Sequence, residues 1–205
     1  LYRFDIRMNW KVKRNTMTIE EWAERLFSAR QANQPKPCCA DEIEDVDEAM
    51  AYRVQAAFVD KMVRHSPISG FKGALTTKAA QASMGMDRPA SGVLLKSMEW
   101  PNESVIKRSS FIFPVMETEI GVVLGKDVTS ILSVSDLPET IAHYQPMVEM
   151  ADVGADNPSL MTVYDFIAGN SAAAGYISGE KSEIRDVNNV VVTLSKDGET
   201  LHEGK

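Results

Sequence analysis

The sequence predicts an α+β protein in which two amphipathic helices precede a longer β-rich region. Apolar residues recur at helical spacing in residues 18–32 and 46–63, whereas from Ser69 onward the apolar runs are short and separated by Gly, Pro, Asn and Asp. Helices followed by a run of strands are typical of a mixed, mostly antiparallel sheet with the helices at one end.

The composition is that of a globular protein of one domain or slightly more. Of the 205 residues, 44% are hydrophobic and 25% are charged, and the formal net charge is −7. No window reaches the roughly 18 apolar residues that a membrane span requires. No basic cluster of the kind that binds nucleic acid is present. We therefore expect a cytoplasmic protein with neither a membrane nor a nucleic acid as its partner.

The first predicted helix covers residues 18–32. Thr18 followed three residues later by Glu21 is a capping box, and apolar side chains then recur at helical spacing from Ile19 to Phe27. Residues 1–16 show neither helical nor strand periodicity and are expected to be a non-native leader, with a native start at Met17 and Met8 as the second candidate. Residues 17–68 are expected to form a helical N-terminal arm.

A Pro-flanked linker, residues 34–39, separates the two helices. It contains Cys38 and Cys39, which are adjacent and therefore unsuited to an ordinary disulfide, and which lack further Cys or His at metal-binding spacing. We expect free thiols. After the linker, Asp45 with Glu48 repeats the capping pattern and predicts a second helix that ends near Val63.

The β-rich domain is expected over residues 69–205. A threonine, Thr76 or Thr77, caps a short helix that Gly85 ends, and an Asp197-Gly198 turn predicts a hairpin near the C-terminus. The predicted strands are 70–75, 92–98, 111–124, 145–151, 172–178 and 190–194, and the predicted helices of this region are 78–84, 135–143 and 162–168.

Two glutamates on one strand are the sharpest chemical feature. Side chains alternate along a strand, so Glu117 and Glu119 point to the same face of residues 111–124. Two adjacent carboxylates repel each other, and burying them is costly unless a cation neutralises them. A divalent metal would remove that cost. The alternative is that this face is simply solvated.

A second acidic element lies in the strand 145–151, which places Glu149 within it and Asp152 just beyond its end. Carboxylates converging from two strands would form an oxygen-only site suited to Mg²⁺ or Mn²⁺, and the absence of His counts against Zn²⁺. A surface acid on an edge strand is the alternative for Glu149.

One lysine, Lys72, stands alone in the apolar strand 70–75. It could extend its amine to solvent or, beside a metal site, bind an anionic substrate and transfer protons. The histidines (His65, His143 and His202) have no Ser or Cys nucleophile motif nearby, so a hydrolytic triad has little support.

Three segments, in this order, resemble a known family, the 2-keto-4-pentenoate hydratases. They are Gly70-Phe71-Lys72-Gly73-Ala74-Leu75 with the residues up to Gln81, then Gly85-Met86-Asp87-Arg88-Pro89 with Gly92-Val93-Leu94, and then the run from Glu117 to Gly125. The family is part of the fumarylacetoacetate hydrolase superfamily, alongside the 4-oxalocrotonate decarboxylases. The resemblance covers Thr18 to the C-terminus and implies a β-sandwich or roll of the superfamily's C-terminal type, cut short after Lys205.

The resemblance also implies the residues of the site. It makes Glu117, Glu119 and Glu149 the ligands of Mg²⁺ or Mn²⁺ and Lys72 the catalytic lysine, with Met84 and Ser171 at the substrate. The implied reaction is metal-dependent hydration of a 2-hydroxy-2,4-dienoate in the catabolism of aromatic compounds. The implied partners are a small dienoic acid, further copies of the chain in a homo-oligomer, and a paralogous decarboxylase or downstream aldolase.

Other functions stay open beside this one. A 4-oxalocrotonate decarboxylase would share the metal ligands, and an acylpyruvate or fumarylacetoacetate hydrolase is a third possibility. Two departures from the family pattern motivate a non-enzymatic alternative, a catalytically degraded assembly subunit: Ala90 replaces an acid, and Gly169 replaces the Asp of an Asp-Asn-Ala-Ser-Ser run.

Overall fold

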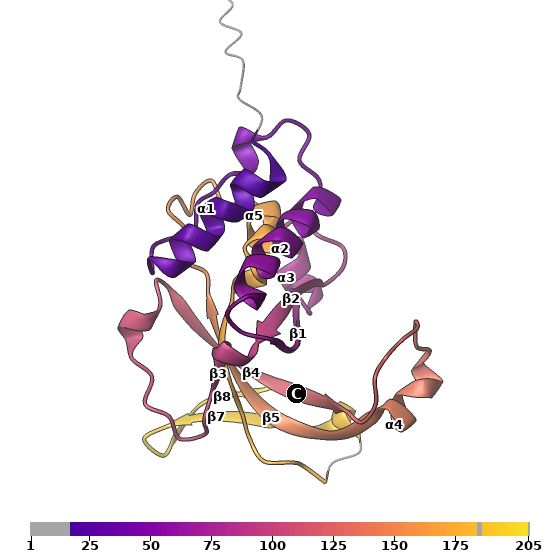
Figure 1. Ribbon diagram of the computed structural model, residues 1–205. Helices are drawn as coiled ribbons and strands as arrows, with labels where there is room; N and C mark the ends of the chain where they lie inside the picture. Colours follow the sequence, from indigo (N-terminus) through magenta and orange to yellow (C-terminus); the bar gives the residue numbers. More distant parts are fainter. Residues whose placement is uncertain (1–16, 184–185, 205) are drawn as a thin grey trace, which may run out of the picture.

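The structure is a computed structural model that describes residues 17–183 and 186–204. The predicted leader, residues 1–16, lies outside the described residues. The described chain is an α+β protein with few helices and a mixed sheet (Figure 1). Its helices are α1 (Ile19–Gln31), α2 (Glu48–Val63), α3 (Lys78–Ser83), α4 (Leu137–Thr140) and α5 (Val163–Ala168). Its strands are β1 (Ile68–Ala74), β2 (Ala90–Leu95), β3 (Glu99–Trp100), β4 (Pro114–Leu124), β5 (Ile141–Asp152), β6 (Ala173–Ser178), β7 (Val192–Lys196) and β8 (Glu199–Gly204).

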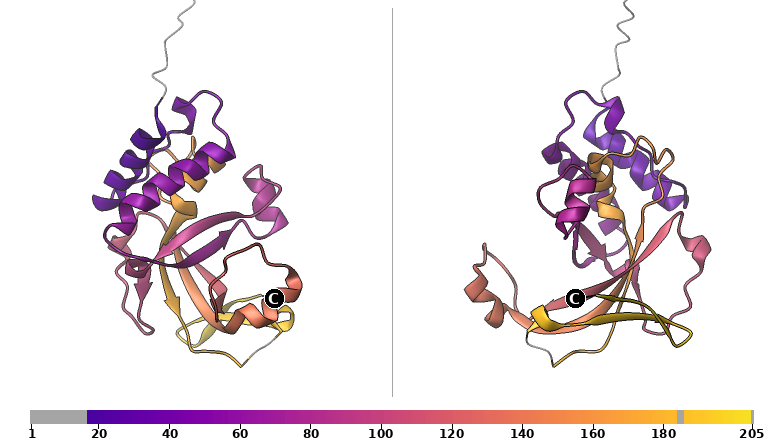
Figure 2. Two further views of the ribbon diagram at one scale, coloured as in Figure 1. Left: turned by 45° about the vertical axis from the view of Figure 1, so that its right-hand side comes forward. Right: turned by 180° about the vertical axis from the view of Figure 1, so that it is seen from behind.

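The described strands form a four-stranded sheet and two hairpins. In the sheet the strand order is β3-β6-β5-β4, with β3 parallel to β6 and the other neighbours antiparallel. Strands β1 and β2 pair as one antiparallel hairpin, and β7 and β8 as another. Figures 1 and 2 show α1, α2, α3 and α5 gathered at one end of the molecule, with β4, β5, β7 and β8 at the other. None of the described helices is long and apolar enough to cross a membrane.

The helical end is a packed core. The capping box at Thr18 is present, and the apolar face that it starts places Trp22 and Leu26 at 0% and 1% exposure. These side chains meet Phe58 of α2 and Leu95 of β2 in one cluster. Burying side chains of this size contributes about 1.5–3 kcal/mol each, so this cluster fixes the helices against β2 and β6.

Most predicted elements are confirmed, but several of their boundaries differ from the prediction. Helix α2 begins at Glu48 because Asp47, not Asp45, accepts the Met50 N–H at its N-terminus; Asp45 has a φ of 56°, outside the helical range. The predicted strand 92–98 ends at Leu95 and continues as a 3₁₀ turn. Cys38 and Cys39 are free thiols, as expected.

The predicted helix 135–143 is largely wrong. A 3₁₀ turn and α4 occupy residues 134–140, but β5 already begins at Ile141, which pairs with Leu124 of β4. Pairing with a long neighbouring strand outweighs the local helical pattern there. Strand β3 was not predicted, since two residues are too few to show a periodicity.

One buried carboxylate joins the linker to the β-rich region. Asp165 of α5 accepts the Cys39 and Ala40 N–H groups at 2.7 and 2.9 Å, while its second oxygen accepts the Thr162 N–H and hydroxyl. Asp165 is 7% exposed. It thus supplies an acceptor to backbone donors that would otherwise be buried without one.

We expect Asp165→Ala to lower the free energy of unfolding by about 2–4 kcal/mol, because each unsatisfied buried donor costs about 1–3 kcal/mol. Urea denaturation measures this. The matched control is Asp136→Ala, which removes an exposed cap from the 3₁₀ turn 134–136 and should cost about 1 kcal/mol or less. Equal losses in the two variants would contradict the role given to Asp165.

Candidate metal centre

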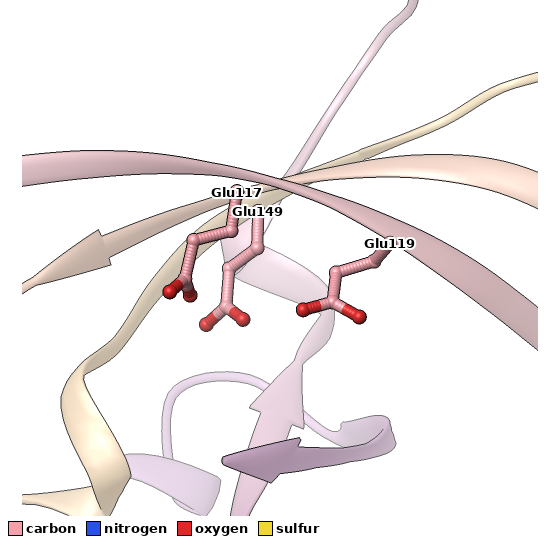
Figure 3. A group of neighbouring side chains, drawn as sticks. All are labelled: Glu117, Glu119 and Glu149. Carbon is pink, nitrogen blue, oxygen red and sulfur yellow. The ribbon is translucent and has the colours of Figure 1, made fainter. Parts of the chain in front are cut away.

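The register of β4 and β5 brings three glutamates together. Glu117 of β4 is the direct cross-strand partner of Glu149 of β5, so their side chains share one face of the sheet. Glu119 lies two residues along β4 and shares that face too. Figure 3 shows the three side chains pointing to the same side of the two strands.

The three carboxylates are close but differ in exposure. One oxygen of each lies within 4.8 Å of one oxygen of each of the others. Glu117 and Glu119 are exposed, whereas Glu149 is 5% exposed. The exposure of Glu117 and Glu119 agrees with the alternative of a solvated face for these two residues. The alternative of a surface acid on an edge strand is wrong for Glu149, which is buried on β5 between β4 and β6.

A lysine compensates the buried glutamate. Nζ of Lys72, from β1, lies 2.5 Å from Oε1 of Glu149, and the two side chains are 7% and 6% exposed. Lys72 also donates to the main-chain oxygen of Ser171 at 3.1 Å. Breaking a buried ion pair by removing one partner costs about 3–5 kcal/mol, so Lys72 and Glu149 hold each other in place.

A strained turn provides the second acceptor for Lys72. Residues 170–172 all have positive φ (61°, 48° and 62°), a conformation that costs non-glycine residues about 1 kcal/mol or more each. The turn is held by the Asn170 side chain, whose Oδ1 accepts the Val93 N–H and whose Nδ2 donates to the Val93 oxygen, at 2.7 and 2.8 Å. The Ser171 hydroxyl donates to the Ser91 oxygen at 2.8 Å.

Gly92 makes room for this turn. It is the cross-strand partner of Lys72 in the β1–β2 hairpin, and a Cβ atom there would lie 2.8 Å from the Asn170 oxygen. Any side chain at Gly92 would push the turn away from β2. The hairpin and the turn thus act together to place the Lys72 amine.

Burial and crowding shift the acid equilibria of the site. Desolvation raises the pKa of Glu119 above its usual 4.5, and the charge of Glu117 raises it further. Desolvation also raises the pKa of Glu149, although the ion pair with Lys72 opposes this. Crowded carboxylates that resist ionisation become easier to ionise beside a cation.

The residues present fit a divalent cation. Three carboxylates with no nitrogen or sulfur ligand are the donor set that Mg²⁺, Ca²⁺ or Mn²⁺ prefers. With Lys72 as their close cation, the three carboxylates retain excess negative charge that a divalent ion would balance. This is the chemistry on which the proposal below relies.

The other residues that the sequence analysis names for the site, Met84, Ser171 and Asp152, do not belong to the cluster of three glutamates. Met84 is half-buried at the C-terminal end of α3, and Ser171 is fully buried with its hydroxyl bonded to Ser91. Asp152 does not join the glutamates, because its carboxylate accepts the N–H groups of residues 112, 113 and 154. Asn170 was missed, although its place in the family's Asp-Asn-Ala-Ser-Ser run was a usable signal.

The fold is a mixed α+β fold, and its three clustered glutamates lie beside a buried lysine. This is the arrangement that the resemblance to metal-dependent hydratases and decarboxylases implies. Comparison with known proteins confirms the resemblance to the 2-keto-4-pentenoate hydratase group of the fumarylacetoacetate hydrolase superfamily. No family model matches the chain.

Two hydratases and one solved structure of a decarboxylase illustrate this similarity. The 2-keto-4-pentenoate hydratase of Paraburkholderia phymatum is 27% identical over 191 residues, covering 91% of this chain and 72% of the relative. The 2-oxo-hept-4-ene-1,7-dioate hydratase of Escherichia coli is 30% identical over 164 residues, which cover 77% of this chain and 61% of the relative. The 4-oxalocrotonate decarboxylase from Pseudomonas putida G7, complexed with magnesium and adipate, has a TM-score of 0.84 and 26% identity, covering 92% of this chain and 74% of that one.

We expect one Mn²⁺ to bind per chain and Glu119→Gln to weaken its binding by about tenfold or more, since even changes beside a metal ligand cost about 10–100-fold in affinity. Electron paramagnetic resonance titration measures free Mn²⁺. Glu199→Gln, an exposed glutamate of β8, is the matched control and should bind as the parent chain does. Unchanged affinity in Glu119→Gln would contradict the site.

The raised pKa of Glu119 predicts a pH effect in the metal-free protein. Because the folded chain holds this proton to higher pH than the unfolded chain, protonation stabilises the fold at low pH and that contribution is lost as pH rises above about 4.5. The parent chain should therefore lose stability relative to Glu119→Gln between pH 4.5 and neutrality. Urea denaturation in the presence of a chelator measures the free energy of unfolding of both proteins at each pH. A difference between them that stays constant with pH, or that changes in favour of the parent chain as pH rises, would contradict the raised pKa of Glu119.

Proposed function

We propose that the chain is a divalent-metal-dependent hydratase, a lyase that adds water to a 2-hydroxy-2,4-dienoate. Its substrate would be 2-hydroxypenta-2,4-dienoate or a longer homologue, and the product of the former would be 4-hydroxy-2-oxopentanoate. The observation that carries the proposal is the cluster of Glu117, Glu119 and Glu149 beside buried Lys72. The hydratases among its relatives support the reaction class.

The three glutamates would hold Mg²⁺ or Mn²⁺. When bound, the cation supplies a Lewis acid for the carboxylate and 2-oxo oxygens of the substrate and stabilises the negative charge of its enolate. Glu117 and Glu119 are exposed, so a substrate can reach their side of the site from solvent, while Glu149 and Lys72 close the buried side.

Lys72 would move the proton. A lysine ammonium has three N–H donors, and within the described part of the chain Lys72 uses two of them, on Glu149 and on the Ser171 oxygen. The third is available to a substrate. Proton transfer at Nζ would convert the dienol into the α,β-unsaturated ketone, to whose far end water then adds. Ser171 would act through its carbonyl, which orients Lys72, and Met84 would contact the substrate.

Decarboxylation of 4-oxalocrotonate is the second candidate. The observation that favours it is the TM-score of 0.84 to a 4-oxalocrotonate decarboxylase. The two reactions use the same kind of metal site and differ in whether the pocket handles a second substrate carboxylate. The same assay therefore has to offer both substrates.

Several broader features belong to this proposal. We place the four-stranded sheet in a β-sandwich or roll of the fumarylacetoacetate hydrolase type, with residues 17–68 as a helical arm and 69–205 as the catalytic domain. The structural similarity to the decarboxylase supports this fold. A homo-oligomer in the cytoplasm, associated with a paralogous decarboxylase or a downstream aldolase, completes the proposal.

The test is turnover of each substrate by the purified chain with Mg²⁺. We expect loss of the dienol absorbance with 2-hydroxypenta-2,4-dienoate, no carbon dioxide from 4-oxalocrotonate, and loss of turnover in Glu119→Ala with little loss of fold. Activity of the Glu199→Ala control should match that of the parent chain.

Carbon dioxide release from 4-oxalocrotonate would instead assign the decarboxylase. No turnover of either substrate by a folded chain that binds the metal would favour a degraded assembly subunit. Equal turnover in the parent chain and Glu119→Ala would contradict the catalytic role of the three glutamates.

A further inference from the structure

A partly polar cavity lies outside the three-glutamate site. Its volume is about 170 Å³, and it opens between the C-terminal end of α1, the linker, residues 110–112 and the neighbouring ends of β5 and β6. Its polar lining is Arg30, Asn33, Gln34, Lys36, Ser110 and Asp152. Neither Lys72 nor any of the three glutamates lines it.

Two cationic side chains, Arg30 and Lys36, line this cavity. The Arg30 guanidinium donates to the main-chain oxygen of Ala173 at 3.1 Å, and the Lys36 amine donates to the main-chain oxygen of Asp152. Ala173 is the cross-strand partner of Ala151, the residue that precedes Asp152. The two acceptors therefore lie on adjacent strands at nearly the same level.

Neutral carbonyls hold both cations, and among the described residues neither cation has a carboxylate within ion-pair distance. Of the described residues that line the cavity, Asp152 alone carries a carboxylate. Its two oxygens accept the N–H groups of Ile112, Phe113 and Gly154 at 2.8, 2.8 and 3.0 Å, which fixes the carboxylate in the wall. Two cations thus face one carboxylate, and the cavity carries excess positive charge.

The environment of Lys36 reflects this excess. Lys36 is half-buried, and desolvation, together with the nearby Arg30 charge, lowers its pKa to about 8, although Asp152 opposes the shift. A bound anion would offset both the desolvation and the repulsion. In the described chain, the positive charge of Arg30 and Lys36 is therefore only partly balanced by Asp152.

The unused donors suit an oxygen anion. Arginine offers five N–H donors in a planar fork and lysine three, and each side chain uses one donor on protein among the described residues. The fork matches the paired oxygens of a carboxylate or phosphate. The volume is below the roughly 300–1,000 Å³ of pockets for drug-sized ligands, so a small anion fits best.

We propose that this cavity is a binding site for a small oxoanion, a carboxylate or a phosphate, held between Arg30 and Lys36. The site shares no side chain with the three-glutamate cluster, so it does not depend on the proposed hydratase activity. It also binds its ligand without the metal.

Nuclear magnetic resonance tests the proposal on the full metal-free chain. Sodium acetate and sodium phosphate are titrated separately at constant ionic strength, with chloride as the balancing ion. We expect saturable shifts of the Arg30 side-chain N–H and the Ala173 amide with at least one of the two anions. The anion with the higher affinity identifies the ligand class.

Two arginine variants distinguish specific binding in the cavity from non-specific attraction of anions to the positive charges of the surface. Arg30→Gln should weaken binding by about tenfold or more, since it removes a charged, forked donor. Arg25→Gln is the matched control, because Arg25 lies on the same helix but is paired with Glu42 at 2.9 Å, and it should bind as the parent chain does. Lys36→Gln provides a second variant if Arg30→Gln does not fold.

Three results would overturn the proposal. They are shifts that do not saturate with either anion, equal affinity in the parent chain and in the folded Arg30→Gln or Lys36→Gln variant, and shifts confined to residues around Lys72. The first would mean that neither anion binds the cavity specifically, and the last that the anion binds at the three-glutamate site.

Discussion

The crowding of three carboxylates on one face of the β4–β5 pair is the constraint around which the described structure is arranged. The register makes Glu117 and Glu149 direct neighbours, and strand alternation adds Glu119. Lys72 pairs with the buried member of the three. Since one lysine cannot balance three glutamates, the metal-free site keeps an excess of negative charge among the described residues, which a divalent cation would offset.

The rest of the fold places Lys72 where it is needed. Gly92 lets the turn 170–172 approach β2, and Asn170 holds that turn in a conformation that its residues would not otherwise favour. The turn then offers the Ser171 oxygen to Lys72. Local strain is tolerated here because packing and side-chain hydrogen bonds over-determine the turn. The same chain segment leads directly into β6, so the lysine, the turn and the sheet form one unit.

The sequence alone predicted those parts that depend on local patterns. Capping signals and apolar spacing located α1, α3 and α5 to within a few residues. Strand alternation placed Glu117 and Glu119 on one face. Alternation along one strand does not show that Glu149 lies opposite Glu117, because the register between β4 and β5 depends on pairing across a long connection. It also does not show that Lys72, 77 residues away in the sequence, pairs with Glu149. The residues alone suggest that carboxylates of the two strands could converge, and the family resemblance adds Lys72 to the site, but the Lys72–Glu149 ion pair is a property of the folded chain.

A crystal structure of the chain soaked with Mn²⁺, with anomalous scattering recorded, tests the central claim most directly. We expect one anomalous peak per chain, at about 2.0–2.3 Å from an oxygen of each of Glu117, Glu119 and Glu149, with Lys72 still in contact with Glu149. Well-ordered glutamates with no peak among them, or a peak elsewhere on the chain, would contradict it.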